Sequence, residues 1–222
     1  MTLFAPFRSA ARAALVALAA LSLAGCGINS VPAKEEAVNA QWANVQSAYQ
    51  RRADLIPNLV ATVRGAAGSE SEILSAVTDA RARATSINIT SEDLSDPAEF
   101  QRFQEAQNQL TQALGQLRTV VEAYPQLQSQ ARFADLMTAI EGAENQINIE
   151  RMRYNEAVQD YNTEIRTFPS VIGARIIHGA KPRIPFQASA GAETAPTVDF
   201  GPMGGAPAND NAEPQAPAAA AN

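Results

Sequence analysis

The sequence predicts an all-α protein, an antiparallel up-down-up-down four-helix bundle with long helices and a kinked first helix. Two observations predict this fold. Apolar side chains recur at alternating spacings of four and three residues in four stretches of the chain, the heptad pattern that gives each helix one apolar seam. Short polar or proline-containing segments separate these stretches, and short connections favour antiparallel neighbours.

The first helix is expected at about 33–65. Pro57 falls inside it, and a proline normally breaks or kinks a helix. The apolar seam nevertheless keeps its phase across the proline, because Ile56 and Leu59 continue the spacing. This continuity predicts one kinked helix. The alternative is a fresh helix start at this point, with Asp54 as its N-cap.

The second and third helices carry their own start signals. The second begins at Ser69, with Glu72 three residues later as a capping box, and ends near Ile87. The third has Asp96 as N-cap and ends at Pro125, because a proline disfavours helical geometry in the residue before it. A mostly polar loop is expected between these two helices.

The fourth helix, from about Ser129 to Phe168, is expected to be the longest, at roughly 60 Å for a rise of 1.5 Å per residue. Four polar side chains interrupt the seams of the helices: Arg52, Gln107, Glu144 and Arg151. Antiparallel pairing about Pro125 places Gln107 level with Arg151. These residues predict either a polar layer that fixes the helix register or a buried polar site inside the bundle.

The N-terminus reads as a targeting segment. Residues 1–25 combine two arginines, no acidic residue and a short apolar run, the composition of a secretory signal peptide or membrane anchor. The sequence LAGC at 23–26 resembles a bacterial lipobox, which implies cleavage before Cys26 and acylation of its thiol. A linker at 26–32 would then join the lipid to the bundle at 33–200. The alternative is an uncleaved single-pass anchor.

The composition excludes several classes of function. The net charge is −6, which disfavours nucleic acid as a partner because phosphate binding needs a basic surface. One cysteine and one histidine disfavour a Cys/His zinc site and catalytic triads. No Glu-x-x-His motif is present for a di-metal bundle. We therefore expect no metal, no cofactor and no catalytic residue, and His178 is read as structural.

The C-terminal part of the chain divides into two segments. Residues 201–222 are almost entirely Gly, Ala, Pro, Asn, Asp and Glu, too poor in apolar side chains to offset the entropy of ordering, so they are expected to form a disordered tail. Residues 181–200 contain several prolines but keep large apolar side chains such as Ile184 and Phe186. This segment is expected to dock on the bundle in extended form.

Several sequence blocks resemble the LemA family. They are QRRADLIPNLV at 50–60, TVRG at 62–65, VEAYP at 121–125, RYNEAV at 153–158, YN at 161–162, FPS at 168–170 and APTVDF at 195–200. The resemblance implies a membrane-anchored helical bundle with no established catalytic residues. Family members commonly carry an N-terminal transmembrane helix, and the lipobox-like ending of this chain departs from that pattern.

Two surfaces are candidates for contacts outside the bundle. Asp54 and Asn58 share one helix face, with Arg51 one turn before. These three residues are read either as an ion pair or cap near Pro57 or as a partner-docking surface. After the fourth helix, Val171, Ile172 and Ile176 are expected to share one apolar face. That face is read either as a cap on the bundle core or as a second contact with the membrane.

These observations predict a membrane-anchored, non-enzymatic helical-bundle protein of the bacterial cell envelope, acting as an interaction or scaffold module. We expect it to be lipid-anchored on the inner or outer membrane, to face the periplasm, and to bind protein partners there. The alternative function is a module that organises or remodels the bilayer. An enzyme is disfavoured, because no nucleophile–base pair, metal cluster or phosphate loop is recognisable.

Overall fold

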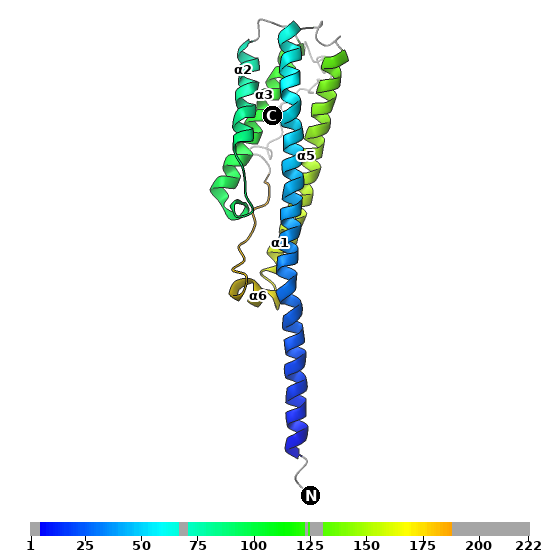
Figure 1. Ribbon diagram of the computed structural model, residues 1–222, viewed down its shortest axis with the longest axis vertical. Coiled ribbons are helices and arrows are strands. Elements are labelled where there is room, and N and C mark those ends of the chain that lie inside the picture. The colour runs from blue at the N-terminus through cyan, green and yellow to red at the C-terminus, as the bar shows by residue number, and fades with distance from the viewer. Residues whose placement is uncertain (1–4, 67–70, 123, 125–130, 188–222) are drawn as a thin grey trace, which may run out of the picture. The chain divides into compact units, whose positions relative to one another are not determined.

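The computed structural model describes residues 5–66, 71–122, 124 and 131–187, with side chains from residue 29 onward except at 66, 120 and 122. Every regular element in this part of the chain is a helix, which confirms the all-α class (Figure 1). The elements are α1 (Ala5–Ala66), α2 (Ser71–Ser86), the 3-10 helix η1 (Asp93–Ser95), α3 (Pro97–Glu122), α5 (Ala131–Glu164) and α6 (Ser170–Ile176). Within the targeting segment predicted at 1–25, the backbone of residues 5–25 belongs to α1, and the linker expected at 26–32 is part of the same helix. The Cys26 thiol, the Ser69 cap and the tail at 201–222 lie outside the described residues and side chains.

Helix α1 runs through Pro57 as one continuous element, and it also contains Pro32. The flanking seam residues Ile56 and Leu59 are almost fully buried, so their packing offsets the backbone hydrogen bond that the proline removes. The alternative of a fresh start with Asp54 as N-cap is therefore wrong. The bend expected at this point stays a prediction.

The capping signal of the third helix is confirmed. The Asp96 carboxylate accepts hydrogen bonds from the backbone N–H groups of Ala98 at 2.9 Å and Glu99 at 3.4 Å, which satisfies two of the unpaired donors at the start of α3. The second helix ends at Ser86, one residue from the end expected near Ile87. The loop that follows is less exposed than its composition suggested, since Ile89 and Leu94 are buried.

The last long helix differs most from the prediction. Helix α5 ends at Glu164 rather than near Phe168, and a short extra helix, α6, follows. The seam pattern had placed Phe168 in the core, but its side chain is 79% exposed. The physical reason includes a contact far along the chain: the Glu164 carboxylate accepts hydrogen bonds from the hydroxyls of Ser170 and of Ser30 in α1, and the chain turns back against α1.

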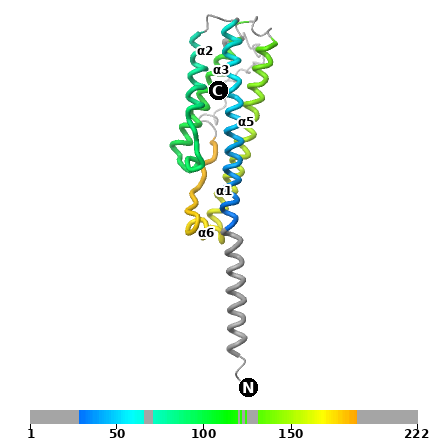
Figure 2. The backbone as a smooth tube through the Cα atoms, viewed as in Figure 1, coloured from blue at the N-terminus to red at the C-terminus, as the bar shows by residue number. Residues whose placement is uncertain are grey.

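The long helices pack in defined pairs (Figures 1 and 2). Helix α1 lies antiparallel to α5, because ion pairs join Lys34 to Asp160 near one end of the contact and Arg52 to Glu144 farther along. Helix α2 packs against both α1 and α3, and α6 packs against α1. These pairs bury two apolar clusters, one around Trp42 and one around Leu59.

An aromatic group fills the cluster around Trp42. The ring of Trp42 lies 5.3–6.1 Å from four neighbouring rings, those of Phe100, Phe103, Tyr154 and Phe186. Its indole N–H donates to the carbonyl of Ile89 at 3.3 Å, so the one polar atom of this large side chain is satisfied. The cluster joins α1, α3, α5 and the segment after α6 in one core.

That segment, residues 179–186, is extended and lies along α5. Gly179 has φ +55°, the left-handed conformation that glycine adopts most easily, and it starts the segment after α6. Two asparagines of α5 then hold the backbone by hydrogen bonds in both directions: Asn162 with Arg183 at 2.8 and 2.9 Å, and Asn155 with Phe186 at 3.0 and 2.8 Å. We call these two side chains the asparagine clamp. The expected docking of this segment is confirmed for residues 183–186.

Candidate functional site

The buried polar residues of the seams converge on one side chain. Arg52 of α1 is 1% exposed. Its guanidinium donates to the Glu144 carboxylate of α5 at 2.6 Å, to the Thr111 hydroxyl at 2.8 Å and to the Gln107 side-chain carbonyl at 2.7 Å, the last two on α3. The Gln107 amide in turn donates to the carbonyl of Ala84 in α2 at 3.2 Å. The Arg52 cluster (Arg52, Gln107, Thr111 and Glu144) thus links the four long helices.

The arrangement corrects one predicted layer and supports one interpretation. Gln107 had been placed level with Arg151, but the structure instead joins it to Glu144 through Arg52, and the Arg151 guanidinium lies 4.7 Å from the centre of the Phe186 ring. The physical reason is that the planar guanidinium donates to acceptors on two helices at once. Within the described residues this cluster is used for helix-to-helix contacts, the geometry of a register-fixing layer.

A second polar group fixes the end of the described helices where α6 lies. Arg183, 8% exposed, donates to the Ser95 hydroxyl at 3.0 Å and to the carbonyl of Ser91, and it forms an ion pair with Glu35 of α1. Its guanidinium also lies 5.9 Å from the centre of the Tyr161 ring. Sequence reasoning missed this residue. Its only signal was a basic side chain between two prolines in a segment expected to dock.

The environment shifts several titratable groups near this end. Hydrogen bonds from the hydroxyls of Ser170 and Ser30 hold the pKa of the Glu164 carboxyl below its ordinary value of 4.5, since they stabilise the charged form. Burial raises the pKa of the Tyr154 hydroxyl, which donates to the carbonyl of Ile184 at 3.1 Å. At neutral pH the Glu164 carboxyl is therefore charged and the Tyr154 hydroxyl is neutral. In these forms both groups make the hydrogen bonds that hold the chain after α5.

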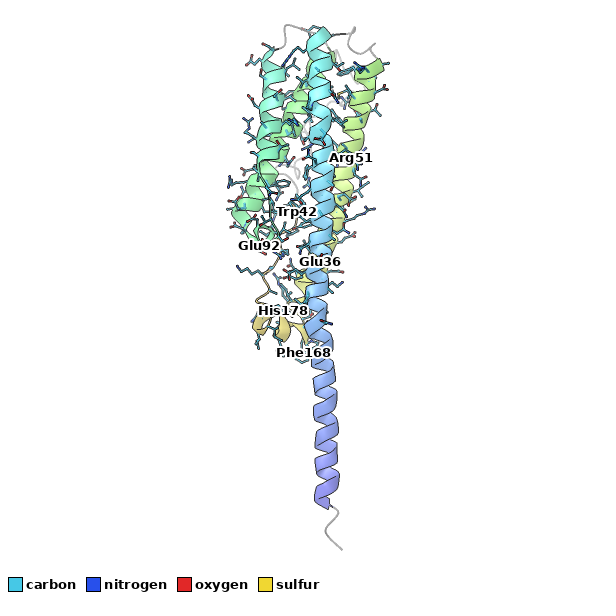
Figure 3. All side chains as sticks on the ribbon, viewed as in Figure 1. Glu36, Trp42, Arg51, Glu92, Phe168 and His178 are labelled. Carbon is cyan, nitrogen blue, oxygen red and sulfur yellow. The ribbon has the colours of Figure 1, made fainter. Side chains whose placement is uncertain are left out.

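The predicted docking residues Arg51, Asp54 and Asn58 are all exposed on α1. The ion pair expected between Arg51 and Asp54 is not among the interactions of the described residues; Asp54 accepts instead from the Gln50 amide at 2.7 Å. Arg51 and Asp54 line a groove of about 770 Å³ that is bordered also by α2 and α3, whereas Asn58 lines a second groove bordered by α5. Figure 3 shows Arg51 well along α1 from α6.

The predicted membrane-contact residues divide between two environments. Ile172 and Ile176 of α6 are 53% and 79% exposed, whereas Val171 is half-buried. Ser170, Gly173 and Ala174 of the same helix are buried. In Figure 3, Phe168 and His178 lie at either end of this helix. One side of α6 thus covers the core, and the other side is open.

The described residues include no group of three or more His, Cys, Asp or Glu side chains that could hold a metal ion. None of the helices in this part of the chain combines the length and apolar character that crossing a bilayer requires.

Comparison with known proteins gives two findings. Residues 41–200 match the LemA family. The chain is also similar to the magnetosome proteins MamQ 1 and MamQ 2 of Paramagnetospirillum magneticum, each 29% identical over 157 residues. The aligned region is 64% of this chain, and it spans 58% of the length of each of these curated relatives.

We predict that Arg52→Met lowers the free energy of unfolding by about 3 kcal/mol, because the Glu144 and Gln107 side chains lose a buried partner. Arg52→Met combined with Glu144→Met is expected to recover most of this loss. Chemical denaturation monitored by circular dichroism measures both. The matched control is Arg102→Met, whose ion pair with Glu99 is exposed and whose loss is expected to cost less than about 1 kcal/mol. Equal destabilisation by the single and double variants would contradict the prediction.

We predict that Glu164 stabilises the protein in a pH-dependent manner. Its folded-state pKa lies below the ordinary value of 4.5, so its contribution is fully present above pH 4.5 and disappears as the pH falls through the folded-state pKa. Thermal unfolding of the parent protein and of Glu164→Gln should differ at neutral pH and converge in acid. A difference that stays constant over this range would show that the carboxylate charge is not responsible.

Proposed function

The chain belongs to the LemA family, and from this premise we propose that it is a membrane-anchored, non-enzymatic helical module of the bacterial cell envelope. In this proposal the four long helices form one antiparallel up-down-up-down bundle that presents fixed helix faces to protein partners. The observation that carries the proposal is that the buried arginines serve to join elements of the fold. Arg52 and Arg183 both bind side chains of other elements, and such links favour a protein of fixed shape that acts as a scaffold.

The anchor is proposed to be a lipid on Cys26. The thiol follows a short apolar run and small residues, and the chain has no other cysteine. Packing between the described elements begins close to this point, because Val31 is fully buried. A lipid at Cys26 would therefore hold the helices close to the membrane on its periplasmic side.

The partner surface is proposed to be the exposed face of α1 that carries Arg51, Asp54 and Asn58. A charged and a polar side chain beside a groove suit recognition of a polar protein segment, because rim charges set specificity and association rate. The groove at Arg51 and Asp54 is bordered by three helices. Gln107 of the Arg52 cluster lines this groove, and this support favours a surface of constant shape.

A second candidate function is organisation of the bilayer itself. The open side of α6 favours it, since Ile172 and Ile176 expose large apolar side chains to solvent. In that case the anchor and α6 would act together on lipid, and the α1 face would be secondary. The two candidates differ in whether a protein or a lipid contact is essential.

We predict that the protein extracted from membranes has the mass of a chain that begins at Cys26 and carries acyl groups. Intact-mass spectrometry of the detergent extract measures this directly. Cys26→Ser should prevent both the acylation and the cleavage. A full-length chain without added mass in the parent protein would overturn the lipid anchor and favour the single-pass alternative.

We predict that Asp54→Ala removes a partner contact while leaving the fold intact. Photo-cross-linking from position 51 in intact envelopes should give a discrete product that Asp54→Ala and Asn58→Ala abolish. The matched control is Glu105→Ala on α3, because the Gln101–Glu105 hydrogen bond of 2.7 Å repeats the Gln50–Asp54 geometry. Asp54→Ala and Glu105→Ala each remove one of these exposed hydrogen bonds, and each should lower the free energy of unfolding by only about 0.5 kcal/mol. Unchanged cross-linking in Asp54→Ala, or strong destabilisation by it, would assign these residues to the fold.

A further inference from the structure

The exposed apolar side chains of the protein are concentrated around α6. Six large apolar side chains are exposed in the described part of the chain. Four of them form what we call the α6 face: Phe168 at 79%, Ile172 at 53%, Ile176 at 79% and Ile177 at 58% exposure. The other two, Ile149 and Met152, belong to α5. A cluster of large apolar side chains left in water marks a site of contact with a partner or a membrane.

Contacts on the opposite side of α6 fix the α6 face in position. Gly173 and Ala174 are buried, and α6 packs against α1. The Ser170 hydroxyl donates to the Glu164 carboxylate, which also accepts from Ser30 of α1. The backbone that carries the four exposed apolar side chains is therefore fixed, and these side chains remain on the surface.

The chain segment that carries the α6 face is basic, and the Glu164 carboxylate beside it accepts hydrogen bonds from the Ser170 and Ser30 hydroxyls. Residues 165–192 contain no Asp or Glu. The same stretch contains Arg166, Arg175 and Lys181, and these three side chains are exposed. The whole chain has a net charge of −6, so this basic rim contrasts with the rest of the protein. A basic rim around apolar side chains matches an anionic lipid surface, which attracts cations and accepts apolar groups.

The α6 face also lies close to the proposed anchor. Helix α6 is tied to Ser30 through Glu164, and Ser30 follows Cys26 by four residues. Four residues span at most about 14 Å of backbone. A lipid on Cys26 would therefore bring the α6 face to the same membrane surface.

We propose that the α6 face inserts into the headgroup region of an anionic bilayer and forms a second attachment beside the N-terminal anchor. This inference rests on the proposed membrane anchoring. The contact would be interfacial, because α6 has only seven residues and a spanning helix needs about 20. It would orient the helices relative to the membrane, since one acyl chain alone binds weakly and leaves orientation free. A second copy of the chain is disfavoured as the occupant, because the two basic rims would repel each other.

The test uses the full chain reconstituted in vesicles of phosphatidylcholine and phosphatidylglycerol. An environment-sensitive fluorophore is attached to Ile176→Cys, and to Met152→Cys as the matched control, because Met152 is also exposed at 60% but lies on α5. Brominated lipids should quench the label at position 176 roughly twofold or more relative to position 152, since interfacial side chains lie about 5–10 Å into the lipid. Equal quenching at both positions would overturn the proposal.

The charge requirement is tested on the same labelled protein. Arg175→Glu combined with Lys181→Glu should reduce quenching at position 176 to the control value, and so should vesicles of phosphatidylcholine alone. Arg64→Glu, an exposed change near the far end of α1, should have no effect. Quenching at position 176 that is unchanged by the charge reversals and by the lipid charge would overturn the assignment to an anionic surface. A label at position 176 that is shielded from water but is not quenched by brominated lipid would mean that protein covers the α6 face. That outcome would also overturn the proposal.

Labelling of the parent protein separates this proposal from the anchor proposal. An acylated Cys26 cannot react, so the parent should take up no fluorophore. Reaction at Cys26 would overturn the lipid anchor alone. The comparison of positions 176 and 152 would then be made in a Cys26→Ser background, and its outcome would still decide the α6 contact.

Discussion

The placement of one arginine determines how the long helices meet. A guanidinium cannot lose its proton in a protein, so Arg52 must find acceptors wherever it is buried. It finds them on α3 and α5, and Gln107 extends the connection to α2. Such a buried pair adds little net stability compared with apolar packing, but it strongly disfavours any other alignment of the helices. Apolar seams alone tolerate a slip of one turn, whereas the Arg52 cluster does not.

The segment after α6 shows a different kind of contact. The asparagine clamp binds the backbone of residues 183 and 186 by paired hydrogen bonds, and Arg183 adds a buried ion pair to Glu35. Phe186 completes the aromatic group around Trp42. The chain end of the described part is thus built into the core. As a result α6, which lies between α5 and this segment, is fixed at both of its ends.

The sequence was sufficient for the helices and insufficient for their alignment. Heptad spacing predicted the long helices and the continuity of α1 through Pro57, and Asp96 predicted the start of α3, because these features depend on neighbouring residues. The partner of Gln107 was missed, since alignment depends on Arg52 reaching two other helices, α3 and α5. The early end of α5 was missed for a similar reason: Glu164 is turned by Ser30, 134 residues earlier in the chain. The docking surface was located only as three exposed residues, which the structure divides between two grooves.

The unbroken length of α1 separates two electrostatic environments. Arg51 follows Ser30 by 21 residues, which is about 32 Å along a helix. Charges in salt solution are screened over about 8 Å at physiological ionic strength. The surface potential of a membrane in contact with α6 has therefore decayed almost completely at Arg51 and Asp54. Changes in lipid composition would act on the basic rim around α6 and leave recognition at the far groove unchanged.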